Sequence, residues 1–190
     1  MKITNGALHA ALFAVAASGL AVSANSQMTH STSVMVGGAA MLPTRNIVEN
    51  AVNSKDHTTL VAAVKAAGLV ETLSGPGPFT VFAPTNAAFA KLPAGTVDSL
   101  VKPENKDTLT KILTYHVVSG TMDSKAIAAA IRAGKGTATL TTVQGEPLTA
   151  KMMGRNLVLT DAKGGMSTVT IADVYQSNGV IHVIDTVLMP

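Results

Sequence analysis

Residues 79–89 read Phe-Thr-Val-Phe-Ala-Pro-Thr-Asn-Ala-Ala-Phe and predict a strand that passes directly into a helix. The first four residues are mostly aromatic or β-branched, which is typical of a strand. The strand ends at Pro84, and Thr85 or Asn86 can accept hydrogen bonds from the free N–H groups that begin the next helix. The apolar side chains here supply core surface, each worth roughly 1.5–3 kcal/mol when fully buried. The stretch therefore predicts a junction that belongs to the scaffold of the fold.

Helical patterns dominate the chain before residue 134, and strand patterns dominate it afterwards. Apolar residues recur at helical spacing in four further segments, 46–52, 58–67, 107–113 and 124–131. From Thr137 onward the period becomes two, with turn residues between the segments. The expected strands there are 137–143, 147–152, 157–160, 167–173 and 180–188, and an earlier one is expected at 115–118. This order, without repeated βα alternation, predicts an α+β domain with an antiparallel sheet.

The first 24 residues are organised as an export signal. Lys2 precedes a run of small and apolar residues, and small side chains at Val22 and Ala24 suit a signal peptidase. The run is shorter than the roughly 20 residues that span a bilayer, and no later stretch approaches that length. We expect a signal peptide over 1–24, a flexible lead-in rich in Ser, Thr, Gly and Met over 25–43, and a folded domain over 44–190. The expected location is secreted or periplasmic, with no membrane span after cleavage.

Composition excludes several classes of protein. The 190 residues include no Cys and no Trp, two Tyr and four Phe, so disulfide scaffolds, thiolate metal sites and Cys nucleophiles are excluded. The net charge of +3 comes from 14 basic and 11 acidic residues without a long run of either sign. A nucleic-acid partner is not expected, because such proteins concentrate basic residues on one stripe.

Motifs of catalysis fail on inspection. Residues 165–169, Gly-Met-Ser-Thr-Val, have Val where a nucleophile elbow has its second Gly. Residues 134–136, Gly-Lys-Gly, lack the spacing and the hydroxyl residue of a phosphate loop. We therefore expect no enzyme activity, no catalytic residue, no cofactor and no dedicated metal site.

Methionine and histidine supply the alternative hypothesis, a small-ligand or copper-handling protein of the cell envelope. Thioether and imidazole groups are suitable ligands for Cu(I) in an exported protein. Methionine is also an adaptable core residue, so the same content suits simple packing. The residues concerned are Met28, His30, Met35 and Met41 in the lead-in, and Met152, Met153, Met166 and Met189 in the strand half.

His116 and His182 each lie within an apolar segment. One interpretation is a buried imidazole whose hydrogen bonds hold the segment in place. The other is a binding residue or a pH switch. Neither has an acidic residue beside it that would indicate catalysis.

Three segments, taken together and in this order, resemble the fasciclin domain. They are residues 79–89, residues 113–118 (Leu-Thr-Tyr-His-Val-Val) and residues 178–190, which begin Asn-Gly-Val-Ile-His-Val-Ile-Asp. The resemblance covers about residues 44–190. The signature residues expected to be structural are Phe79, Pro84, Thr85, Asn86, Phe89, Gly179 and His182.

The resemblance implies a wedge-shaped antiparallel β-sandwich with several helices packed at one end. It also implies adhesion or extracellular binding without catalysis, with a cell-surface, envelope or matrix protein or glycan as partner. We expect the domain to be a monomer or a weak homo-oligomer.

In animal members of the family, an Asp-Ile pair and the Tyr-His segment are implicated in integrin binding. The matching residues here are Asp173 and Val174, with Tyr115 and His116. The segment before Asp173 departs from the animal pattern, so the resemblance transfers a scaffold more securely than a ligand. Asp173 can be a contact residue or a turn acid, and Tyr115 and His116 can be contact or structural residues.

Overall fold

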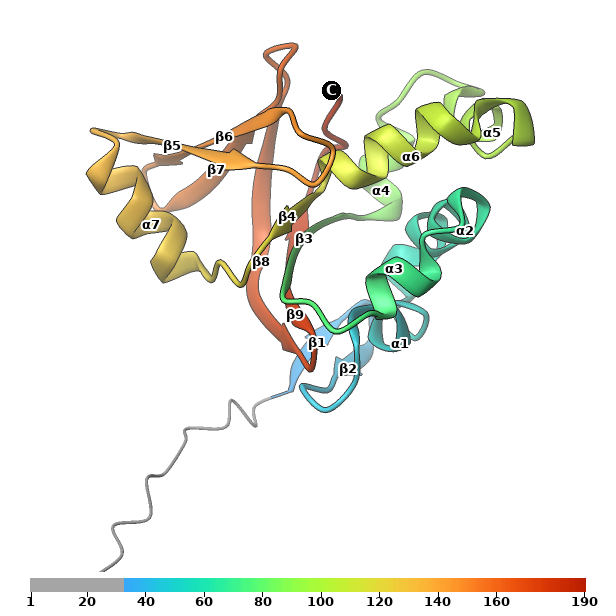
Figure 1. Ribbon diagram of the computed structural model, residues 1–190, viewed down its shortest axis with the longest axis horizontal. Helices are drawn as coiled ribbons and strands as arrows, with labels where there is room; N and C mark the ends of the chain where they lie inside the picture. The colour runs from blue at the N-terminus through green and yellow to red at the C-terminus, as the bar shows by residue number, and fades with distance from the viewer. Residues whose placement is uncertain (1–32) are drawn as a thin grey trace, which may run out of the picture.

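The computed structural model describes residues 33–190 (Figure 1). The signal peptide expected at 1–24 and the start of the expected lead-in lie outside these residues. The strands are β1 (Val34–Val36), β2 (Ala39–Met41), β3 (Phe79–Pro84), β4 (Val117–Ser119), β5 (Thr137–Thr141), β6 (Pro147–Met153), β7 (Asn156–Thr160), β8 (Met166–Gln176) and β9 (Gly179–Ile184). The α-helices are α1 (Ile47–Ala51), α2 (Thr58–Ala67), α3 (Val70–Ser74), α4 (Asn86–Ala90), α5 (Thr96–Leu100), α6 (Lys106–Tyr115) and α7 (Ser124–Ala133), with short 3-10 turns at Lys55–His57 and Pro103–Asn105.

The main sheet bends into a two-layered wedge. Its strand order is β4-β3-β9-β8-β7-β6-β5, and the long strand β8 belongs to both layers. The two ends of the sheet meet again where Val118 of β4 forms a bridge with Thr142, just beyond β5. The sequence prediction of an α+β domain built around a wedge-shaped sheet is confirmed, with one correction. Strands β3 and β9 run parallel, so the sheet is not purely antiparallel.

Two apolar cores hold the layers together. One lies between the strand layers and α7, and it includes Phe82, Leu148, Leu159 and Ile184. The other lies between strands β3 and β9 and the helices α1, α2, α3 and α6, which gather on one side of the wedge in Figure 1. Because β3 contributes Phe82 to the first core and Val81 to the second, the strand of the opening stretch separates them.

The junction after β3 forms as predicted. Thr85 caps α4, and its hydroxyl accepts a hydrogen bond from the Ala88 N–H at 3.2 Å. Asn86 lies one residue further on and ties α4 to the loop before α2, since its side chain donates to the Lys55 carbonyl and accepts from Thr59 N–H. The junction therefore fixes both the helix that follows it and the helix packed beside it.

Two boundaries differ from the sequence prediction. Residues 34–41, expected in the flexible lead-in, form the β1–β2 hairpin, in which Val36 and Met41 are buried. The folded unit therefore includes residues before the expected start at Thr44. Tyr115 ends α6 and His116 caps it, so the strand expected at 115–118 begins only at Val117. The apolar period of α6 continues through Tyr115, and this is why the residue stays helical.

Candidate binding site

Tyr115 is fully buried between the two strand layers. Its hydroxyl donates a hydrogen bond to the Pro147 carbonyl at 3.0 Å and accepts one from the Ala162 N–H at 3.1 Å. Burial is the main reason why the pKa of Tyr115 is raised above its ordinary value. The ring therefore connects α6 to β6 and to the turn after β7, and a partner cannot reach it in this conformation.

His116 is a buried bridge between α6 and the end of the chain. Its Nδ1 lies 2.8 Å from the Ile112 carbonyl, and its Nε2 lies 3.0 Å from the Leu188 N–H. Since the Leu188 N–H can only donate, Nε2 is the acceptor and Nδ1 carries the proton in a neutral ring. Burial lowers the pKa of His116 to about 4, because the charged ring would lose its water.

His182 forms a second neutral bridge, in β9. Its Nδ1 accepts from the Asp173 N–H at 3.3 Å, which leaves Nε2–H to donate to the Met122 carbonyl at 2.8 Å. The ring stacks on Phe82 with a centroid separation of 5.5 Å. Burial is the main cause of the lowered pKa of His182. The histidine thus joins β9 to β8 and to the segment that precedes α7.

Asp173 and Val174 occupy different environments. Val174 is 1% exposed and belongs to the core beneath the helices. Asp173 is partly exposed and has a φ of 60°, a left-handed conformation that Asp tolerates better than most residues. It lies where the β8–β9 register shifts between Ile171 and Val174. Of the four residues predicted to bind a partner, only Asp173 has a side chain that a partner can reach.

The carboxylate of Asp173 is held by the start of α7. It accepts hydrogen bonds from the Ser124 N–H at 2.6 Å and from the Ser124 hydroxyl at 2.5 Å. Asp123 lies beside it, caps α7 through the Ala126 N–H at 2.7 Å, and accepts a hydrogen bond from the Tyr175 hydroxyl at 3.1 Å. We call these four residues, Asp123, Ser124, Asp173 and Tyr175, the Asp173 face.

Hydrogen bonding holds one acid of the Asp173 face, Asp123, in its anionic form. The hydrogen bond from Ala126 N–H is the main reason why the pKa of Asp123 lies below its ordinary value. The pKa of Tyr175 is raised to about 12, mainly by burial and secondly by the hydrogen bond to Asp123. The Tyr175 hydroxyl therefore remains a donor. The face therefore presents negative charge in one geometry at neutral pH.

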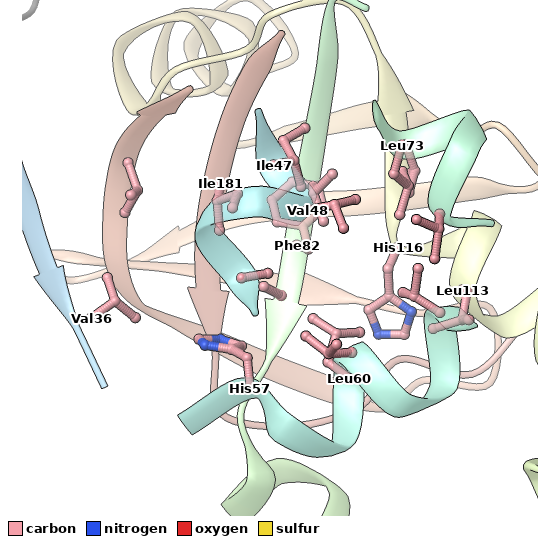
Figure 2. A pocket seen from close by; sticks show the side chains of 18 of the residues that line it. Val36, Ile47, Val48, His57, Leu60, Leu73, Phe82, Leu113, His116 and Ile181 are labelled. Atoms are coloured by element: carbon pink, nitrogen blue, oxygen red, sulfur yellow. The ribbon is translucent and has the colours of Figure 1, made fainter. Parts of the chain in front are cut away.

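An apolar pocket lies on the other side of β3, beneath α1, α2 and α3 (Figure 2). It measures about 40 Å³, and its lining is apolar apart from Lys65, His57 and His116. The two histidines lie on different sides of the pocket. His57 is 2% exposed, and its Nδ1 lies 2.9 Å from the Ser54 hydroxyl. Its Nε2 has no hydrogen-bond partner. Burial lowers the pKa of His57, and this effect is larger than the opposing effect of the Ala83 backbone.

Two of the signature residues expected to be structural, Gly179 and Phe89, lie where chain segments pack closely together. A Cβ added to Gly179 would lie 2.0 Å from the Phe79 carbonyl oxygen, so only glycine fits opposite this residue in the parallel β3–β9 pair. Phe89 is buried in the core beneath the helices. Asn178, next to Gly179, donates to the carbonyls of Leu73 and Gly75 and accepts from Ile47 N–H. The closing segment thus holds α1, α3 and the sheet together.

Metal-binding geometry is not evident in residues 33–190, where no group of three or more His, Asp or Glu side chains could hold an ion. The exposed methionines are also dispersed. Met152 pairs with Leu157, and Met166 pairs with Thr160, so the two methionines lie at opposite ends of β7, about 10 Å apart along the strand. Met28 and His30 lie outside the described residues.

The described part of the chain contains no helix that is both long enough and apolar enough to cross a membrane. This part of the chain is a bent, mostly antiparallel sheet with most of its helices packed on one side, α7 packed against β5 and β6, and buried histidines at its strand junctions. The model of the Fasciclin domain matches residues 55–190, and the chain belongs to this family.

Several relatives carry the same domain. The chain is 52% identical over 162 residues to Protein sll1483 of Synechocystis, covering 85% of this chain and 83% of the relative. It is 40% identical over 143 residues to the Immunogenic protein MPB70 of Mycobacterium bovis, covering 73% and 65%. Transforming growth factor-beta-induced protein ig-h3 of the pig is 41% identical over 131 residues, which span 69% of this chain but 17% of that protein.

A solved structure shares the fold. The FAS1 domain pair of the insect cell adhesion molecule Fasciclin I superposes with a TM-score of 0.69 at 18% sequence identity, covering 78% of this chain and 52% of that one. This likeness concerns the fold alone.

Sequence reasoning named Asp173 but missed its partner Ser124 and missed His57 as a lining residue. Ser124 lies at the start of the helix expected at 124–131, but its contact with Asp173 spans 49 residues and has no local signal. His57 lies before an apolar helix without any pattern that distinguishes it from a surface histidine.

Proposed function

We propose that this protein is an exported, non-catalytic adhesion domain that binds another protein at the cell surface or in the matrix through the Asp173 face. Asp173 carries the proposal, because it is the accessible member of the residues that resemble the animal binding segment. Membership of the fasciclin family supports the general role, and the insect relative is named as a cell adhesion molecule.

The arrangement of the Asp173 face supports recognition rather than folding alone. A left-handed backbone at a non-glycine residue costs free energy, and such positions cluster at functional sites. Asp123 and Asp173 are both held by hydrogen bonds at the start of α7, and within residues 33–190 neither forms an ion pair. A rigid anionic surface of this kind pays little ordering entropy on binding.

A capture experiment with matched variants tests the proposal. The purified domain would be immobilised and exposed to envelope and matrix fractions of its source cells, beside Asp123→Asn and a control, Asp98→Asn. Asp98 is exposed on α5, away from the Asp173 face, and its change alters net charge equally. We expect the Asp123 variant to lose specific partners that the control retains. Equal capture by both variants would overturn the proposal.

A second candidate function, binding of a small ligand, is favoured by the unpartnered Nε2 of His57 in the apolar pocket. At about 40 Å³ the pocket admits only a few heavy atoms, so a short-chain alcohol is a suitable probe. NMR titration with 1-propanol should shift signals of the pocket, and His57→Phe should abolish the shift. Absence of any shift at millimolar alcohol would discard this candidate.

The copper alternative is tested separately by Cu(I) retention, which Met→Leu changes should abolish.

A further inference from the structure

A basic groove begins at the Asp173 face and runs between α7, the β6–β7 hairpin and β8. It measures about 540 Å³, far more than the apolar pocket. Ser124, which binds Asp173, lines one end of it, and Arg132 and Arg155 line it as well. The groove therefore continues the surface to which the proposed function assigns binding.

The charge of this groove is positive. Lys125 and Arg132 project from α7, Arg155 comes from the β6–β7 turn, and all three are exposed. Within residues 33–190 none of the three forms an ion pair. Two acids, Asp123 and Asp173, lie beside the groove next to Ser124. The pKa of Asp123 is lowered mainly by the Ala126 N–H and to a lesser extent by the charge of Lys125. Arg132 and Arg155 are thus left without an opposing acid.

The wall formed by β8 carries a free strand edge. The ladder between β7 and β8 runs from Thr160–Met166 to Val158–Thr168 and then ends. From Val169 onward β8 pairs with β9 on one side, and no described strand pairs with it on the other. Val169, Thr170 and Ala172 of this segment line the groove. An unpaired edge of this kind is a template for an added strand, because its backbone groups are available for pairing.

We propose that the groove binds an extended acidic peptide segment of the partner protein, which pairs with β8 from Val169 to Asp173 and places its carboxylates on Arg132 and Arg155. Bidentate pairing with arginine favours carboxylates. Exposed Met152 and the Leu157 beside it offer apolar contact for the alternate side chains of such a strand. The groove contains no aromatic ring on which a sugar could stack, so a peptide suits it better than a glycan. This inference rests on the proposed function and names the chemistry of its partner.

Fluorescence anisotropy with a labelled peptide of alternating Glu and Val residues tests the groove directly. We expect saturable binding that weakens at least tenfold in the Arg132→Glu/Arg155→Glu double variant. The matched control Lys102→Glu/Lys111→Glu reverses two exposed charges away from the groove and should change the affinity less than twofold. A peptide with the same charges but N-methylated at alternate amides cannot pair with a strand edge and should lose most of its affinity.

Three results would overturn the inference. These are equal loss in both double variants, undiminished binding of the N-methylated peptide, and binding of an acidic polysaccharide such as polyglucuronate in place of the peptide. Circular dichroism and thermal unfolding of each variant confirm that the domain is intact. If the peptide does not bind while the Asp173 face still captures partners, only the groove inference fails. If neither binds, the proposed function fails as well.

Discussion

The Asp173 carboxylate accepts two hydrogen bonds from Ser124, one from its N–H and one from its hydroxyl, at 2.6 and 2.5 Å. The pair connects a bulged position of β8 to the first turn of α7, 49 residues earlier in the chain. It also orients an accessible acid at the mouth of the basic groove. The contact therefore links the stability of the domain to the geometry of its candidate binding surface.

Replacement of Asp173 by Ala should destabilise the domain by about 1–3 kcal/mol, because the Ser124 N–H loses its partner and a left-handed φ becomes less favourable. Asp173→Asn retains an acceptor and a residue that tolerates this conformation, so its loss should be smaller. Urea unfolding at pH 7 measures both values. Identical stability of the two variants would show that the Ser124 contact contributes nothing.

Stability should fall as the pH is lowered from about 6.5 to about 4. The pKa of His116 is about 4 in the folded chain and 6.5 as its ordinary value, so the unfolded chain binds the extra proton in this range. The full contribution, about 3 kcal/mol for such a shift, is present above pH 6.5 and is lost as the pH approaches 4. His57 and His182 also have a lowered pKa and act in the same direction. Urea unfolding at pH 7.0, 5.5 and 4.5 measures the decline, and a constant free energy across these points would contradict it.

The strand and helix of residues 79–89 were predictable because their signals are local. In residues 79–89 the apolar run, the proline and the capping threonine lie side by side, and α4 forms accordingly. The β1–β2 hairpin was missed because three-residue strands carry too little pattern, and part of their packing is against β8, far along the chain. The Tyr-His segment was assigned to a strand because its apolar residues continue without a break from the end of α6 into β4.

The candidate site was less predictable than the fold, for a related reason. Resemblance identified Asp173, but its exposure depends on the register shift in β8, and the groove depends on where β7 and β8 separate. Arg132 and Arg155 are 23 residues apart and look like ordinary surface charges in the sequence. Only the packing of α7 beside the β6–β7 hairpin places them in one groove.

Removal of the β1–β2 hairpin should destabilise the folded domain. A chain that begins at Thr44 loses the burial of Val36 and Met41, worth about 3–6 kcal/mol for two such side chains. A chain that begins at residue 32 retains both. Thermal unfolding of the two forms should place the shorter one many degrees lower, and equal midpoints would show that the domain does begin at Thr44.

Substitution of Asn178 by Ala should be strongly destabilising, by about 2–4 kcal/mol, because buried hydrogen-bonding groups of Ile47, Leu73 and Gly75 lose their partner. Ser177→Ala, at an exposed neighbouring side chain, serves as the control and should change stability by less than about 0.5 kcal/mol. Urea unfolding compares the two, and a similar effect of both changes would refute the structural role of Asn178.

Site-specific photocrosslinking can show whether the Asp173 face and its groove form the binding surface. A photoreactive residue would be placed at Lys125 beside the face and, as the control, at Asp98 on α5, and each protein would be irradiated with intact source cells. We expect discrete covalent adducts with a surface protein from position 125 and none from position 98. Adducts from position 98 alone, with none from position 125, would contradict it.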